Sequence, residues 1–234
     1  MKGDIVDIEL VVFDMAGTTV NDDDSVNRCL RSSLAAAGLS VTGTQVNAVM
    51  GLPKPTAIAR LIEQSESRND LRDQIDAIHD DFVSRSIAFY RDDPSVYEVP
   101  GTTRVFEALK RSGIRVALDT GFNRSIARVV LDRLNWSRSD LIDGTICSDE
   151  VTRGRPHPDM IQTLMARFGV GNAQRVAKVG DTPADLQEGA SAGCGLIVGV
   201  TGGTHSRLEL EPYPHSSLIE TIADFPGLLG LEIS

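Results

Sequence analysis

The feature that most constrains the fold is a series of short apolar runs, each followed by a stretch with helical spacing. The runs cover residues 10–13, 116–118, 177–179 and 196–200. Between them, apolar residues recur at intervals of three and four, as at Ile126, Val130 and Leu134. Strands that alternate with amphipathic helices form a parallel sheet covered on both faces. The sequence therefore predicts an α/β fold with a Rossmann-like, doubly wound parallel sheet.

Residues 25–94 follow a different pattern, because their apolar positions have helical spacing only. Val26, Leu30 and Leu34 illustrate it. The Asp-Asp-Pro sequence at 92–94 marks the return to alternating runs. We predict a helical cap of residues 25–94 inserted into a core of residues 1–24 and 95–234. The proline-containing tail is predicted to be loop and a short closing helix.

Composition and charge exclude several classes of protein. The formal charge of -10 and a pI of about 4.8 give no general attraction to nucleic acid or to anionic membranes. No apolar run approaches the roughly 20 residues of a membrane span, and the first ten residues lack the apolar stretch of a secretory signal. The three cysteines have no C-x-x-C spacing. We therefore expect a cytoplasmic protein with reduced thiols.

Polar groups stand at or beyond the ends of the apolar runs. Asp14 ends the first run, Thr120 lies just after the second, and Asp181 lies just after the third with Asp185 four residues on. Arg155 belongs to the segment TRGRPHPD. Because the carboxyl ends of parallel strands meet at one edge, we expect these side chains to share a crevice.

The types of these residues indicate chemistry on phosphorus. Asp14, Asp181 and Asp185 form the oxygen-rich set that Mg²⁺ prefers. Thr120 and Arg155 offer donors for the oxygens of a phosphoryl group, which leaves Asp14 free to act as nucleophile. Taken singly, each aspartate could be a helix cap and Arg155 a surface ion-pair partner. Their joint order favours a single catalytic site.

The four segments DMAGTT, DTG, GRPHPD and GDTPAD resemble the motifs of the haloacid dehalogenase superfamily, and the helical insert is placed like its common cap. The resemblance implies that Asp14 is the nucleophile and that Thr120 and a basic residue bind phosphate. It also implies that Asp14, Asp181 and the backbone carbonyl of Ala16 hold Mg²⁺, with Asp185 supporting the metal site.

Three positions resemble the phosphonoacetaldehyde hydrolases, or phosphonatases, within that superfamily. Ala16 stands where most phosphatases of the superfamily carry a second aspartate, and Arg155 stands where they carry lysine. Lys54, in MGLPK, resembles the phosphonatase lysine that forms a Schiff base with the substrate aldehyde. Lys54 taken alone could equally be a solvated lysine between two prolines. The resemblance implies that the substrate is bound by Ala16, Gly17, Met50, Gly51, Gly121 and Phe122.

The chain also departs from phosphonatases. Met15 replaces a tryptophan, Phe122 a tyrosine, and Ala57 a histidine that assists proton transfer during Schiff base formation. Two alternatives therefore stay open: a phosphatase of a small phosphorylated metabolite, similar to phosphoglycolate phosphatase, and a catalytically silent phosphometabolite-binding protein. The expected partners are a small phosphonate or phosphate and, through the cap, a second copy of the chain.

Overall fold

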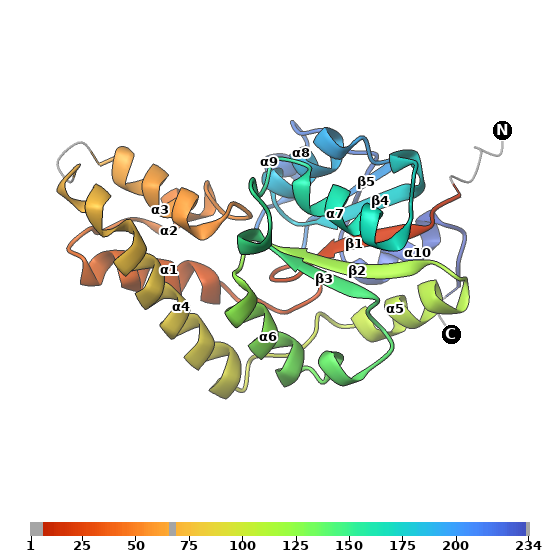
Figure 1. Ribbon diagram of the computed structural model, residues 1–234, viewed down its shortest axis with the longest axis horizontal. Helices are drawn as coiled ribbons and strands as arrows, with labels where there is room; N and C mark the ends of the chain where they lie inside the picture. The colour runs from red at the N-terminus through yellow and green to blue at the C-terminus, as the bar shows by residue number, and fades with distance from the viewer. Residues whose placement is uncertain (1–6, 66–68, 233–234) are drawn as a thin grey trace.

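The computed structural model describes residues 7–65 and 69–232, and these form a sheet lobe and a helical lobe (Figure 1). The described strands form one parallel sheet in the order β3-β2-β1-β4-β5-β6. The strands are β1 Leu10–Asp14, β2 Arg115–Thr120, β3 Gly144–Cys147, β4 Val176–Gly180, β5 Leu196–Val200 and β6 Ser217–Ile219. The predicted doubly wound α/β fold is confirmed.

The helices of the described residues alternate with these strands after the helical lobe. They are α1 Ser25–Ala36, α2 Gly43–Asn47, α3 Lys54–Glu63, α4 Ile75–Asp92, α5 Thr102–Arg111, α6 Arg124–Arg133, α7 Asp159–Phe168, α8 Pro183–Ala192, α9 Arg207–Leu210 and α10 Phe225–Leu228. None of them, within the described part of the chain, is both long and apolar enough to cross a membrane.

Both faces of the sheet are covered, and β1 shows why its residues are apolar throughout. Successive side chains of a strand point to opposite faces. Val11 and Phe13 pack with α5, α6 and α10, whereas Leu10 and Val12 pack with α7 and α8. Figure 1 shows these two groups of helices on opposite sides of the sheet. A central strand buried on both faces cannot alternate apolar and polar residues.

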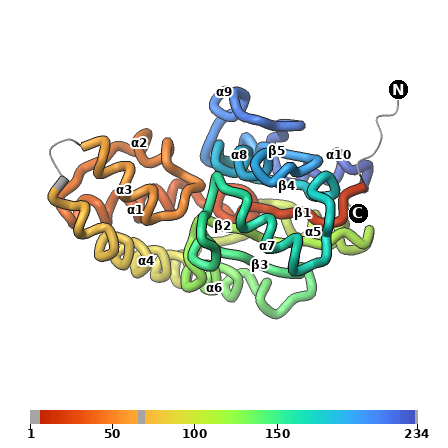
Figure 2. Tube along the Cα trace, turned by 45° about the horizontal axis from the view of Figure 1, so that its top comes forward, coloured from red at the N-terminus to blue at the C-terminus, as the bar shows by residue number. Residues whose placement is uncertain are grey.

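The helical lobe contains α1 to α4 and lies beyond the carboxyl end of β1 (Figure 2). In the described residues between 25 and 94, the regular structure is helical, as predicted. The longest helix, α4, runs from this lobe to the sheet lobe and packs beside α6. The division into a cap domain and a core domain remains a prediction, because α4 belongs to both packing units.

Two strands were not predicted. The strand β3 has the sequence GTIC and is only half-buried over its first two residues, so it has no apolar run to mark it. The tail, predicted to be loop and one helix, contributes β6 at the edge of the sheet beside β5. Both strands are short, and their pairing depends on neighbours that are distant in sequence.

Candidate active site

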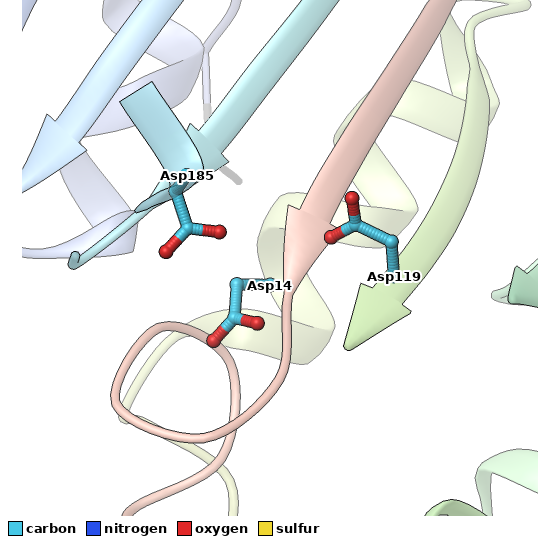
Figure 3. A group of neighbouring side chains, drawn as sticks. All are labelled: Asp14, Asp119 and Asp185. Atoms are coloured by element: carbon cyan, nitrogen blue, oxygen red, sulfur yellow. The ribbon is translucent and has the colours of Figure 1, made fainter. Parts of the chain in front are cut away.

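The carboxyl ends of the central strands bring the predicted residues together. Because β1 pairs in parallel with β2, Asp14 is directly opposite Asp119, next to Thr120. The strand β4 pairs with the other side of β1, and Asp181 follows it. Figure 3 shows Asp14, Asp119 and Asp185 gathered at the end of β1, from β1, β2 and α8. The strand order thus explains why separate segments form one site.

Arg155 is the hub of a buried charge network. It is 2% exposed, and its Nη1 contacts Asp14 Oδ1 at 2.6 Å and Asp185 Oδ1 at 2.9 Å. Its Nη2 pairs with Asp119, and its Nε contacts Glu188 Oε2 at 3.0 Å. A guanidinium has five N–H donors, and three of those of Arg155 are used in hydrogen bonds to Asp14, Asp119 and Glu188. In this arrangement Arg155 orients the Asp14 carboxylate, and its binding of phosphoryl oxygens stays a prediction.

The sequence reasoning missed three members of this network, namely Asp119, Lys178 and Glu188. Lys178, inside β4, pairs with Asp119 and contacts Asp185 Oδ1 at 3.1 Å and Glu188 Oε2 at 3.2 Å. Glu188 lies three residues beyond Asp185 on α8. A signal was present, because a lysine within a buried apolar run must find an opposite charge. We call Arg155, Lys178, Asp14, Asp119, Asp185 and Glu188 the core charge network.

Asp185 is a helix cap as well as a member of this network. Its Oδ2 accepts hydrogen bonds from the Thr182 backbone N at 3.2 Å and the Thr182 hydroxyl at 2.5 Å, while Thr182 Oγ1 accepts from the Asp185 N–H. This reciprocal pair starts α8. Its other oxygen faces Arg155 and Lys178. Thus Oδ2 of Asp185 accepts hydrogen bonds, and Oδ1 forms ion pairs with two cationic side chains.

Asp181 has a different environment. Its Oδ1 accepts from the Thr18 hydroxyl at 2.9 Å and its Oδ2 from the Thr204 backbone N–H at 2.7 Å. A Cβ on Gly17 would lie 2.2 Å from Asp181 Oδ2, and one on Gly203 would lie 2.5 Å from it. Burial raises the pKa of Asp181, and the neighbouring carboxylate of Asp185 raises it further. Two glycines therefore leave close space around this carboxylate, and no cationic side chain of the described residues forms an ion pair with it.

These observations bear on the expected Mg²⁺ site. Burial raises the pKa of Asp14 to about 8, and Asp185 and Asp181 add to the effect although Arg155 opposes it. A divalent cation would stabilise the charged forms of such carboxylates. The oxygens of Asp14 and Asp181 and the Ala16 carbonyl are the hard donors that Mg²⁺ prefers. The residues present therefore fit the ion.

A second candidate for a metal site is the group of three carboxylates at the ends of β1 and β2 and on α8. Asp14, Asp119 and Asp185 each offer an oxygen within 4.8 Å of the others. However, Arg155 contacts all three carboxylates and Lys178 contacts two of them. Burial raises the pKa of Asp119, but Arg155 and Lys178 outweigh burial and lower it. Because these oxygens already face cations, the side that includes Asp181 is the better metal site.

The helical lobe closes the site through close backbone contacts. A Cβ on Gly121 would lie 2.8 Å from the Leu52 carbonyl oxygen and 3.0 Å from that of Gly51. Gly51 itself has φ +80°, and a Cβ there would lie 2.2 Å from Thr182 Oγ1. These glycines let the segment before α3 touch the strand-end loops. The contact places the start of α3 over Asp14.

The two lobes enclose a cavity of about 20 Å³, room for roughly one water. Nine predicted site residues line it, namely Asp14, Ala16, Met50, Gly51, Lys54, Thr120, Gly121, Phe122 and Arg155. Gly17 lines an adjoining cavity instead. Asp181 and Asp185 lie behind these walls, where they contact Thr18, Thr204 and Arg155.

Lys54 is the buried amine of this cavity. It is 3% exposed, so the alternative of a solvated lysine is wrong. Its Nζ lies 6.0 Å from the ring centroid of Phe82 and 5.7 Å from that of Phe122. No carboxylate of the described residues lies within ion-pairing distance of it. Burial lowers the pKa of Lys54 to about 8, although Asp14 and Asp22 oppose the shift.

Comparison with known proteins agrees with this geometry. Residues 8–193 match the model of the haloacid dehalogenase-like hydrolase family. The chain is 30% identical over 210 residues to a phosphonoacetaldehyde hydrolase of Latilactobacillus sakei, covering 84% of this chain and 76% of the relative. It is 27% identical over 216 residues to a phosphonoacetaldehyde hydrolase of Hahella chejuensis, covering 88% of this chain and 72% of the relative.

Solved structures share the fold at lower identity. A phosphonoacetaldehyde hydrolase-like protein from Oleispira antarctica has a TM-score of 0.85 and 22% identity, covering 96% of this chain and 92% of the other. A predicted phosphoglycolate phosphatase from Haemophilus somnus has a TM-score of 0.80 and 20% identity, covering 95% and 98%. Together with the family match and the strand-end aspartates, these comparisons show that the chain belongs to the haloacid dehalogenase-like hydrolases.

Proposed function

We propose that this chain cleaves the C–P bond of phosphonoacetaldehyde or a closely related carbonyl phosphonate. The observation that carries the proposal is the buried amine of Lys54, with a pKa lowered to about 8, in the same cavity as Asp14. An amine with this pKa is substantially neutral near pH 8 and can attack a carbonyl. The relatives named phosphonoacetaldehyde hydrolase support the same substrate class.

An imine at Lys54 would make the C–P bond easier to break. Carbon is a poor leaving group from phosphorus, but an imine on the adjacent carbon accepts the electrons of the C–P bond and becomes an enamine. In this step Asp14 attacks phosphorus, the C–P bond breaks, and an aspartyl phosphate forms that water then cleaves. The enamine takes a proton on carbon, and hydrolysis of the resulting imine frees acetaldehyde and Lys54. Ala16 fits this route, because an enamine needs no carboxylic acid beside the phosphorus.

The protein's groups have separate tasks in this reaction. Arg155 orients the Asp14 carboxylate through the contact of 2.6 Å. Thr120, which is 3% exposed and lines the cavity, offers a hydroxyl to the phosphonyl oxygens. Mg²⁺, held by Asp14, Asp181 and the Ala16 carbonyl, would offset the charge of the phosphonyl group. Since the cavity holds roughly one water, substrate entry requires the helical lobe to move away from the sheet.

The direct test is to incubate the protein with phosphonoacetaldehyde and Mg²⁺ and to measure acetaldehyde and phosphate. We expect the two products in equal amounts. Failure to release either product would reject the proposal. The phosphatase alternative predicts turnover of phosphate monoesters that Lys54→Ala leaves unchanged, and a panel of small monoesters measures it with the same phosphate assay.

A further inference from the structure

Schiff base formation needs a proton donor near Lys54. When a neutral amine and an aldehyde form an iminium ion, the carbonyl oxygen leaves as water and must be protonated. Asp14 is paired with Arg155 at 2.6 Å and is reserved for phosphorus. Ala57, one turn after Lys54 on α3, has no titratable group. The donor must therefore come from a residue near the cavity that the proposed reaction has not yet used.

Asp22, in the loop between β1 and α1, is such a residue. It is 8% exposed. Its Oδ1 accepts hydrogen bonds from the Ser25 hydroxyl at 2.5 Å and from the Val26 backbone N–H at 3.0 Å. Val26 lines the cavity that contains Lys54. Over the described residues, Asp22 Oδ2 has no hydrogen bond or ion pair, so this oxygen is free for chemistry.

The cavities connect Asp22 to the catalytic site. Asp22 lines the adjoining cavity of about 360 Å³, which shares Met50 and Thr204 with the cavity of Lys54. The larger cavity is also lined by Gly17, next to Ala16. Asp22 therefore lies in a space that adjoins the cavity of Lys54, and its neighbour Val26 lines that cavity directly. A carboxyl group can act as a general acid either directly or through one water.

The electrostatics of the pair suit proton transfer. Burial raises the pKa of Asp22, although its bonds to Ser25 and Val26 and the charge of Lys54 act against the shift. Burial lowers the pKa of Lys54, and after Asp14 the charge that opposes this most is Asp22. Each group thus acts on the other, and burial favours the neutral acid beside the neutral amine.

We propose that Asp22 is the general acid and base of imine formation at Lys54. The lone pair of Lys54 Nζ forms the C–N bond with the aldehyde carbon, and the C=O electrons go to oxygen. That oxygen leaves as water with one proton from the amine and one from the Asp22 carboxyl group. The products are the iminium ion and the Asp22 carboxylate, which can later take a proton back. This role rests on the function proposed above.

The test is the rate at which borohydride traps the Lys54 adduct in the presence of phosphonoacetaldehyde. Asp22→Asn keeps an oxygen that can accept from Ser25 and Val26 but has no acidic proton, so we expect trapping to slow roughly 10²-fold. Asp23→Asn is the matched control, because Asp23 is exposed and its φ of 39° is tolerated by asparagine. It should trap at the wild-type rate.

Two further variants separate chemistry from structure. Ser25→Ala removes a hydrogen bond to Asp22 but keeps the acid, so trapping should stay within about threefold of wild type. Asp22→Glu should recover part of the rate lost in Asp22→Asn. If the wild type traps the adduct and Asp22→Asn traps it equally fast, Asp22 has no such role and the proposed function stands. If the wild type forms no adduct, the Schiff base and the role of Asp22 both fail.

Discussion

Two lysines are buried in the described part of the chain, and their surroundings differ. Lys178, in β4, is 0% exposed and contacts Asp119, Asp185 and Glu188. Lys54, at the start of α3, is 3% exposed and has the rings of Phe82 and Phe122 near its Nζ. Lys178 thus belongs to the core charge network, whereas the Lys54 amine lies near two aromatic rings.

Their pKa values shift in opposite directions. Burial and Arg155 act to lower the pKa of Lys178, but Asp119, Glu188 and Asp185 outweigh them and raise it. Burial lowers the pKa of Lys54 to about 8, because its acidic neighbours do not compensate. Burial alone therefore does not set the role of a lysine. The number of carboxylates in contact decides whether the pKa of a buried amine rises or falls.

The largest expected effect is the loss of chemistry in Lys54→Arg. A guanidinium keeps the positive charge but cannot deprotonate in a protein, so it cannot form an imine. We expect release of acetaldehyde from phosphonoacetaldehyde to fall roughly 10³-fold or more. Arg60→Lys, at an exposed position on the same helix, should keep wild-type activity. An active Lys54→Arg variant would show that Lys54 contributes only its charge.

Removal of divalent cations should distinguish the chemistry of the sheet lobe from that of the helical lobe. With a chelator, we expect phosphate release to fall roughly 10²-fold or more, because the phosphonyl group loses its cation. Borohydride trapping at Lys54 should continue, since the amine belongs to the helical lobe. Parallel assays of phosphate and of the trapped adduct measure both. If trapping stops together with phosphate release, the imine depends on the core site.

Lys178→Met should destabilise the fold by roughly 3 to 5 kcal/mol, because it leaves buried carboxylates without their counter-ion. Lys110→Met removes a lysine that is 32% exposed and paired with Asp143, and should cost about 1 kcal/mol or less. Chemical denaturation of both variants measures the difference. Equal losses would mean that the core charge network contributes no more than a surface pair.

Lys54→Met should have the opposite effect on stability to Lys178→Met, and a smaller one. The folded pKa of about 8 lies below the usual 10.5, so between these values the unfolded chain binds the extra proton and wild-type stability rises with pH. The burial cost is therefore complete below pH 8 and absent above pH 10.5. We expect Lys54→Met to be roughly 2 to 3 kcal/mol more stable than wild type at pH 7. Denaturation at pH 7 and pH 10 should show this gain shrinking.

The sequence indicated the strand-end residues because each follows an apolar run in a parallel sheet. Asp14, Thr120 and Asp181 were placed correctly on this basis. The core charge network was harder to predict. The pairing of Asp119 with Arg155 and Lys178 depends on the register of three strands and on the return of a distant loop. No spacing along the chain encodes these contacts.

The burial of Lys54 also depends on tertiary structure. Its neighbours in sequence are prolines, a pattern compatible with an exposed turn. The amine is buried because the Gly51 and Leu52 carbonyls rest against Gly121, and because Phe82 and Phe122 approach from different lobes. Sequence resemblance indicated the residue. The burial of its amine results from the contact between the two lobes, which the local sequence does not show.

The most direct test of this account is to find which lysine the substrate modifies. The protein is treated with phosphonoacetaldehyde and borohydride, digested, and analysed by mass spectrometry. We predict a substrate-dependent reduced adduct on the peptide containing Lys54, loss of activity in proportion to the adduct, and an unmodified Lys178. Turnover of phosphonoacetaldehyde without an adduct on Lys54, or with the adduct on another lysine, would contradict the account.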